Sequence, residues 1–435
     1  MYLGANFKMT LARFISQRLR STDGDSFTRI ILYFAVGTIA LCVAVILLAH
    51  ALILGFKTEI KAKVFGFWGH IQITGLNLNN TFESPPIQDK QTFYPALDTV
   101  GRITLELDPD AGRGTRQTTF GGIRHIQAYA LKPGILTGRE DLDGIILKGV
   151  GADFDWEFLS RYMVDGEPLR VTDTVPSRDI LISQTTASRL RLGINDPLIV
   201  YFIQENRQIE RRFRVRGIYK TGLEEYDRKL ALVDIRQIRE VNGWPEHAVT
   251  GFEVVLDDLR DLDAFTNYIY YEWLPDDLYI EPISQKFPAI FDWVDLQNIN
   301  ERVLIILMLI VAMINLITVL LILILERLTM VGILKALGAS DGMIRSIFIR
   351  LTLRILVWGM AIGNAVALSV GMIQSRFQIM KLDEAEYYLS VVPIRWDPWF
   401  ILFVNVLLVL VAVMTLWIPS MYIKRIQPVK SIQFK

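Results

Sequence analysis

The sequence predicts a membrane protein whose apolar helices carry a large folded domain outside the bilayer. The 435-residue chain is 51% apolar and has a mean hydropathy of +0.32, which soluble chains of this length seldom reach. Because about 240 residues separate the first two apolar windows, one or two further cores fit between them. The predicted fold class is an α-helical membrane domain of four transmembrane helices with a large α+β external domain. Windows long and apolar enough to span a bilayer are Phe27 to Leu54, Val303 to Leu325, Ile355 to Ile373 and Trp399 to Ile418.

Clusters of basic residues predict the orientation of the chain. Both the amino-terminal segment and the tail are basic, and the tail carries no acidic residue. By the positive-inside rule, both termini then lie in the cytoplasm and the region between the first two spans lies outside. The basic residues are Lys8, Arg13, Arg18 and Arg20 at one end, and Lys424, Arg425, Lys430 and Lys435 at the other.

These observations divide the chain into nine segments. Residues 9–20 place apolar side chains on one helical face, which is typical of a helix lying on the inner leaflet. The expected order is a cytoplasmic interfacial helix within 1–26, the first span with its extension at 27–56, the external domain at 57–300, the second span at 301–325, a cytoplasmic segment at 326–349, the third span at 350–374, an external loop at 375–396, the fourth span at 397–419 and a cytoplasmic tail at 420–435.

The segments that flank the external domain keep a helical period. After the first span, GFKTEIKAKVFGF alternates apolar and charged residues at helical spacing until Gly66 and Gly69. Ahead of the second span, FPAIFDWVDLQNINERV does the same. We therefore expect both spans to continue as helices beyond the membrane.

The sequence of the external region predicts two βαβ halves with an insert between them. Strand-like runs at 70–74 and 102–107 flank a helix-like run at 90–97, and strands at 251–256 and 278–283 flank a helix at 259–273. The intervening stretch, roughly 122–248, is richer in strands. The expected domain is thus a split βαβ part into which a β-rich part is inserted.

The sequence offers no chemistry of its own. No GxxxxGK[ST] phosphate-binding motif occurs, and the lone GxG of Gly149 and Gly151 carries no weight. One cysteine, Cys42, lies in the first span, and four histidines argue against metal chemistry. With 46 basic and 46 acidic residues, the net charge of zero gives no support for a nucleic-acid partner. We therefore expect neither an enzyme nor a bound cofactor or metal.

A short amphipathic run between the second and third spans predicts a partner. Leu328, Val331, Leu334 and Leu337 recur every three residues as an apolar stripe. Gly338 suits the left-handed position that ends a helix, and Ser340 can cap the next helix, with Asp341 in its first turn. The run thus reads as a surface helix held by another protein, or as a turn with no partner. Its polar positions are Glu326, Arg327, Lys335 and Ser340.

The third span carries small residues four apart, a spacing that lets helix backbones approach closely. They serve packing within the chain or between subunits. Asn315 and Asn364 are the polar residues deepest in their spans and can bond across helices. The small residues are Gly359, Gly363, Ala367 and Gly371.

The run E-R-x4-G-I-L-K-A-L-G-A-S, with the closing IPSMYIKRIQPVKSIQF, resembles the MacB/FtsX-type (type VII) ABC transporter permeases. The resemblance covers nearly the whole chain. It implies that the run docks on a separate ATPase, which would bind ATP and Mg. The implied coupling residues are Glu326, Arg327, Leu328, Val331, Leu334, Lys335, Leu337, Gly338, Ala339 and Ser340.

Within that family the chain looks most like the lipoprotein-releasing permeases of the LolC/LolE type, through FISQRLRS, GFKTEIKAKVFGFWGHIQI and RRFRVRGIYKTGLEEYDRKLALVD. The resemblance implies an inner-membrane permease that releases lipoproteins toward the outer membrane. It also implies a periplasmic domain with a porter-like split βαβ part and an inserted sabre-like part. The implied partners are a LolD-like ATPase dimer, a second permease copy or paralogue, a lipoprotein, a LolA-like periplasmic carrier and membrane lipid.

One departure from that branch leaves the function open. A long hook loop that grips the carrier precedes RRFRVRGIY in LolC-type permeases, whereas residues 203–210 here predict a short polar hairpin. Glu205, Asn206 and Arg207 are the remaining candidates for carrier docking. The short hairpin puts carrier docking by a hook in doubt and leaves open a LolE-like partner or a branch that docks differently. The alternatives to lipoprotein release are an FtsX-like permease that transmits motion to an external cell-wall hydrolase, and MacB-like efflux.

Overall fold

The structure, a computed structural model, describes residues 26–76, 85–106, 116–137, 142–172, 175–204, 207–383, 387 and 389–420. The chain divides into two compact units, and each is described by itself. The helical unit comprises residues 1–57, 293–381 and 391–435, and the sheet unit comprises residues 58–292 and 382–390. The predicted interfacial helix at 9–20 and the tail beyond Ser420 lie outside the described residues.

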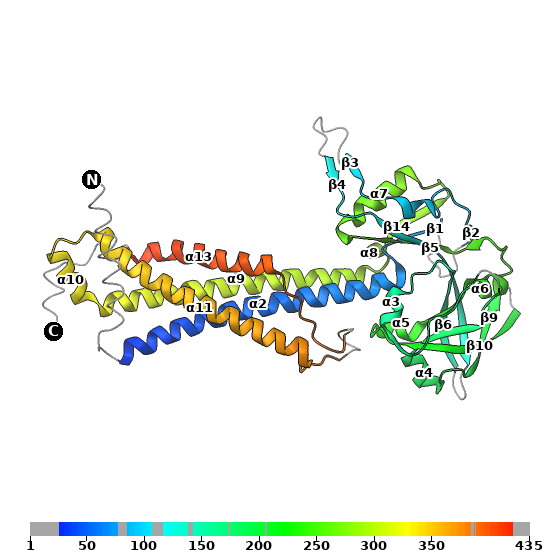
Figure 1. Ribbon diagram of the computed structural model, residues 1–435, viewed down its shortest axis with the longest axis horizontal. Coiled ribbons are helices and arrows are strands. Elements are labelled where there is room, and N and C mark those ends of the chain that lie inside the picture. The colour runs from blue at the N-terminus through cyan, green and yellow to red at the C-terminus, as the bar shows by residue number, and fades with distance from the viewer. Residues whose placement is uncertain are drawn as a thin grey trace. The chain divides into compact units, whose positions relative to one another are not determined.

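Long apolar helices build the helical unit (Figure 1). Among the described residues, three helices are long and apolar enough to cross a membrane: α2 (Ser26–Trp68), α9 (Pro288–Glu326) and α11 (Asp341–Phe377). The last helix, α13 (Pro398–Ser420), is also apolar, but its stretch Pro398–Met414 is shorter than a full span. The chain is therefore a membrane protein, and its fourth span stays a prediction.

The helices at both ends of the sheet unit continue past the apolar windows. α2 runs on to Trp68 and is followed by Gly69, whose φ of +67° only glycine adopts readily. α9 begins at Pro288, in the first turn where proline costs no hydrogen bond. The predicted helical extensions of the first two spans are confirmed.

The small residues of α11 lie against α2. A Cβ added at Gly359 would lie 2.6 Å from Ile39 Cγ2, and one added at Gly363 would lie 2.6 Å from the Ala40 carbonyl oxygen. Ala367 is buried in the core that joins the helices, and Gly371 lies under the Trp396 ring. In this chain the small-residue stripe therefore packs one helix of the unit closely onto another.

Two polar contacts join helices within the same unit. The side-chain amides of Asn364 on α11 and Asn405 on α13 donate to one another, at 2.9 and 3.2 Å. His50 Nδ1 on α2 lies 2.5 Å from Glu301 Oε1 on α9. Asn315, the other deep amide, is half-buried and makes no side-chain hydrogen bond to the described residues.

A ten-stranded sheet organises the sheet unit, and six of its strands close into a ring. Each strand of the ring pairs with the next, in the order β5, β6, β11, β8, β10, β9 and back to β5. Beyond the ring, β13, β1 and β14 extend the sheet from β5, and β7 pairs with β10. The strands are β1 (Ile71–Gly75), β5 (Ile123–Thr137), β6 (Leu142–Val150), β7 (Met163–Gly166), β8 (Asp179–Ser183), β9 (Pro197–Gln204), β10 (Arg207–Tyr219), β11 (Leu230–Asp234), β13 (Gly251–Leu256) and β14 (Leu278–Pro282).

The long strand β5 joins the open part of the sheet to the ring. Residues 123–129 pair with β13, whereas residues 135–137 pair with β9 on the same side. Gly134 lies at the changeover, and a Cβ there would come within 2.8 Å of Val200 Cγ1. A glycine at this point therefore lets β9 close the ring.

A core of buried aliphatic and aromatic side chains from both parts of the sheet fills the sheet unit.

Short helices and turns cover the sheet. The helices are α3 (Glu157–Arg161), α4 (Gln184–Leu190), α5 (Glu224–Lys229), α6 (Ile235–Asn242), α7 (Leu262–Glu272) and α8 (Ile283–Lys286), with 3-10 turns η1 (Ala96–Thr99) and η2 (Leu259–Asp261). Two small ribbons pair β2 (Ile87–Gln88) with β12 (Ala248–Val249), and β3 (Thr104–Glu106) with β4 (Arg116–Thr118).

Of the two predicted βαβ halves, only the second forms. β13, α7 and β14 match it, but residues 90–97 form turns and the start of η1, because Pro95 interrupts the run and has no N–H to donate. β3 pairs with β4 rather than with the main sheet. The predicted insert at 122–248 also shares one sheet with its host, since β5 runs through both parts.

Candidate functional site

The connection between α9 and α11 is built as a separate short helix. α9 ends at Glu326, and Arg327 (φ −105°, ψ 20°) leaves the helical conformation before α10 (Leu328–Ala336) begins. The Arg327 carbonyl still accepts from the Val331 N–H at 3.0 Å, which closes the first turn of α10. The break lets α10 take a direction of its own at the end of α9 (Figure 1).

The end of α10 is set by backbone hydrogen bonds around Gly338. The Ala339 N–H donates to the Leu334 carbonyl at 2.9 Å, and the Gly338 N–H donates to the Lys335 carbonyl at 3.0 Å. This is the Schellman arrangement, which requires a left-handed residue at the position of Gly338. Its φ of +84° confirms that prediction.

Ser340 then starts α11. Its hydroxyl accepts from the Met343 N–H at 3.4 Å, and Asp341 occupies the first turn, where a negative charge is favourable. The predicted cap is confirmed. Lys335 Nζ lies 3.0 Å from Asp341 Oδ1, so an ion pair also joins the last turn of α10 to the first turn of α11.

The predicted apolar stripe does not form one face. Val331 is buried in the helical core and Leu328 and Leu334 are half-buried, but Leu337 is 79% exposed. The reason is geometric: at 100° per residue, nine residues from Leu328 to Leu337 make two and a half turns. The apolar surface that α10 presents outward consists of Leu337 and Ile333, which is 48% exposed.

The remaining candidates of the run border this surface. Glu326, Gly338 and Ser340 are exposed, whereas Arg327, Lys335 and Ala339 are half-buried. Sequence reasoning missed Ile333, although its spacing of four from Leu337 is the signal that places both on one side of a helix.

The second set of candidates lies at the β9–β10 turn. Glu205 and Asn206 lie outside the described residues. Arg207 is exposed and pairs with Gln204 as the last pair of the ladder. Because only two residues separate the paired ends, the short connection expected in place of a hook is present.

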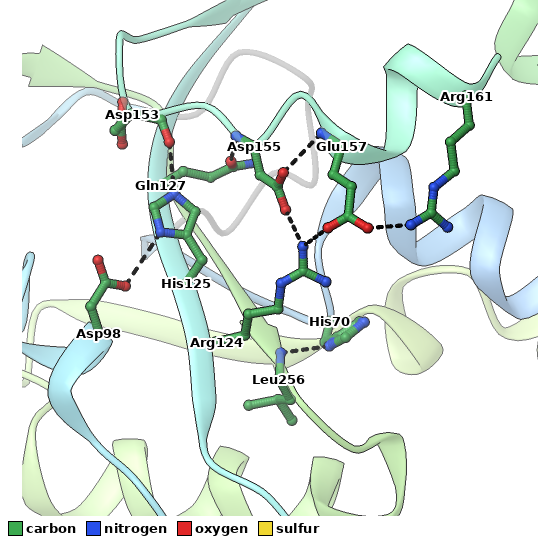
Figure 2. A network of polar contacts seen from close by, with 10 residues as sticks. All are labelled: His70, Asp98, Arg124, His125, Gln127, Asp153, Asp155, Glu157, Arg161 and Leu256. Atoms are coloured by element: carbon green, nitrogen blue, oxygen red, sulfur yellow. Dashed lines mark hydrogen bonds and ion pairs between the residues drawn. The ribbon is translucent and has the colours of Figure 1, made fainter.

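A polar network in the sheet unit is a further concentration of charged groups, and it ties β5 to neighbouring loops. Figure 2 shows Arg124 reaching from β5 to the carboxylates of Asp155, at 2.9 Å, and Glu157. His125 Nε2 lies 2.7 Å from the Asp153 carbonyl oxygen. These contacts are structural. Within the described residues, no group of three or more histidines, cysteines or acids is placed to hold a metal ion.

His70 belongs to the same region and is half-buried. Its Nδ1 accepts from the Leu256 N–H at 2.7 Å (Figure 2). Burial, helped by the charge of Arg124, lowers the pKa of His70 from 6.5 to about 4.

Comparison with known proteins points to one transporter family. Residues 302–428, which contain α10, α11, α13 and most of α9, match the family described as "FtsX-like permease C-terminal". Over 96% of its length the chain is 22% identical to the "Lipoprotein-releasing system transmembrane protein LolC" of Xylella fastidiosa (strain 9a5c), and it covers 97% of that protein. The protein of the same name from Neisseria meningitidis serogroup B is 21% identical, with the same shares of both chains covered.

A solved structure is also similar in part. It is the extracellular domain of the noncanonic ABC-type transporter YknZ from Gram-positive bacteria, with 13% identity over 49% of this chain and 100% of that one. Its TM-score of 0.31 is too low to carry an argument about the fold.

Proposed function

Because the chain is an FtsX-type ABC transporter permease similar to LolC, we propose that it extracts lipoproteins from the inner membrane and releases them toward a periplasmic carrier for the outer membrane. The energy comes from a separate ATPase. This chain itself hydrolyses no ATP, so ATP and Mg belong to the partner subunit.

The observation that carries the proposal is the outward apolar surface of α10. A nine-residue helix with its own start and its own end keeps Leu337 and Ile333 exposed. Isolated helices this short are marginal in water, so tertiary contacts hold it. Val331 and Leu334 supply such contacts on one side. Exposed leucine and isoleucine on the other side suit the groove of a partner protein.

The proposed topology follows from this assignment. α10 lies in the cytoplasm, where a LolD-like ATPase dimer docks, and the sheet unit lies in the periplasm. A second permease copy or paralogue completes the transporter, and membrane lipid surrounds α2, α9 and α11. A LolA-like carrier receives the lipoprotein.

Two observations bear on the cargo. The proteins that match along nearly the whole chain are named for lipoprotein release, which favours that cargo. The two-residue connection between Gln204 and Arg207, where LolC-type permeases carry a hook, suits a LolE-like permease or a branch that docks its carrier differently. The second candidate is an FtsX-like permease that transmits motion to an external cell-wall hydrolase. MacB-like efflux has no specific observation in its favour.

Docking on α10 is tested by Leu337→Asp. A charge at this exposed site leaves the fold intact, and we expect ATPase co-purification in detergent to fall at least about tenfold, as for a central interface residue. Thr329→Asp, an equal charge at an exposed position elsewhere on α10, is the control and should leave binding unchanged. Undiminished co-purification of the Leu337 variant would remove α10 as the docking site.

The cargo is tested by reconstitution. The permease and its candidate ATPase are placed in proteoliposomes with an acylated lipoprotein, and release into solution is followed with and without ATP. ATP-dependent release supports the proposal. ATP hydrolysis without release, together with activation of an added cell-wall hydrolase, supports the second candidate instead.

A further inference from the structure

The carboxyl-terminal end of α2 lies inside the sheet unit. Its last turns are buried through Ile60, Val64, Phe67 and Trp68. Gly66 allows this fit, because a Cβ there would come within 2.1 Å of the Phe158 ring. A helix end in such a place must find partners for its last carbonyl groups.

Lys148 on β6 supplies one of these partners. Its Nζ donates to the Phe67 carbonyl oxygen and lies 2.7 Å from Glu253 Oε1 on β13. The side chains of Lys148 and Glu253 are 2% and 0% exposed. The rings of Trp68, Tyr129 and Phe154 surround the ammonium group, with their centroids 5.4 to 5.8 Å away.

Gln72 on β1 supplies a second partner, and other side chains orient both. Gln72 Nε2 donates to the Trp68 carbonyl at 3.2 Å, while its Oε1 accepts from Lys286 Nζ at 2.5 Å. Gln127 on β5 donates to Glu253 Oε2 at 2.8 Å. The last two carbonyls of α2 are thus held by side chains from two strands of the main sheet, β6 and β1.

Stability alone does not account for this arrangement. Burial lowers the pKa of Lys148, and the Glu253 carboxylate opposes that shift. The enclosed pair therefore carries a desolvation cost. A buried ion pair is seldom more stabilising than apolar residues of the same size. What apolar residues cannot do is hold the carbonyl groups of a helix end and fix its position within the sheet.

We propose that Lys148 is a positioning residue that clamps the end of α2 to β6 and β13, so that a displacement of α2 is passed to the sheet. α2 is continuous from Ser26 to Trp68, so its clamped end belongs to the same helix that contains the first apolar span. The inference rests on the proposed function, because it supplies the route from ATPase-driven helix motion to the sheet unit.

The test compares hydrogen exchange of the full permease–ATPase complex with ATP and with ADP. The variant Lys148→Met with Glu253→Gln removes both charges. The new glutamine oxygen still accepts the hydrogen bond that Gln127 donates. We expect the nucleotide-dependent change in exchange at β6 and β13 to fall by about tenfold, a typical coupling factor, while ATP hydrolysis stays unchanged and the double variant stays folded. Lys132→Met is the matched control, since Lys132 is equally buried but donates to Gln204 rather than to α2.

Each outcome decides the matter. An unchanged nucleotide response at β6 and β13 in the double variant overturns the proposal, and so does an equal loss in the Lys132 control. If the double variant does not fold, Gly66→Ala displaces the same helix end without removing a charge, and an undiminished response there overturns it as well. The readout needs no cargo, so failure of the wild type to release lipoprotein would count against the proposed function alone.

Discussion

Two helix ends in this chain are completed in opposite ways. α10 ends through hydrogen bonds within the six residues from Leu334 to Ala339, around a glycine with a φ of +84°. α2 ends on a lysine 81 positions further along the chain and on Gln72 of the adjoining strand. The first end is exposed and the second is fully enclosed.

The two kinds of helix end respond differently when the helix moves. A locally completed end keeps its hydrogen bonds when the segment shifts as a body, which suits a helix that a partner is to grip. An end completed from distant strands keeps its hydrogen bonds only when the strands move with it.

Lys148→Met alone should cost about 3–5 kcal/mol of unfolding free energy, because it leaves the Glu253 carboxylate buried without its cation. Denaturant unfolding of the sheet unit in the full chain measures this. Adding Glu253→Gln should restore most of the loss, since no unpaired charge remains. A single variant as stable as the wild type would mean that the two helix ends differ less than their contacts indicate.

His70, two residues after α2, makes the enclosed end sensitive to pH. With its pKa lowered to about 4 from 6.5, the unfolded chain binds a proton that the folded chain excludes between these values. The free energy of unfolding is therefore highest above pH 6.5 and falls by about 3 kcal/mol as the pH is lowered to about 4. His70→Asn, which can still accept from the Leu256 N–H, should flatten this part of the stability–pH profile. An unchanged profile would contradict the assignment.

Gly338→Ala should destabilise the end of α10 by about 1–2 kcal/mol, through the left-handed backbone alone. No heavy atom lies within 4 Å of the added Cβ, so no clash contributes. Gly338→Asn should cost less, because asparagine tolerates this conformation. Local hydrogen exchange of the Ala339 amide measures both, and equal effects of the two substitutions would argue against a backbone cause.

Ser340→Ala should have the smallest effect, about 0.5–1 kcal/mol, the lower end for loss of an amino-terminal cap. The hydrogen bond that it removes is long, at 3.4 Å to the Met343 N–H. Faster exchange of that amide, with no change at α2, is the expected result. A global loss of stability would show that Ser340 does more than cap α11.

The sequence predicts what is decided within a few residues. Gly338, Ser340 and the helical runs that extend α2 and α9 carry their signals locally, and these predictions are confirmed. The docking role of α10 and the fourth span stay predictions. The spacing of small residues in α11 is visible in the sequence. The sequence does not reveal that α2 is the helix they pack against, because the two helices are far apart along the chain.

Contacts between distant strands escape such reasoning. Neither the pairing of β5 with β9 nor the bond from Lys148 to the Phe67 carbonyl has a local pattern. The prediction that Leu328 to Leu337 form a single apolar stripe was wrong for a different reason. A spacing of three residues advances by 300° and drifts around the helix, so the leucines divide between core and surface.

The ring of six strands has a consequence for aggregation. A strand with unpaired backbone groups is a template on which other chains stack into aggregates. Ring closure removes that hazard from the strands that it contains. In the described part of the chain, the main sheet terminates in β14 and β7, of five and four residues, and β14 ends on Pro282, which has no N–H to offer. The sheet therefore offers few unpaired backbone groups to another chain.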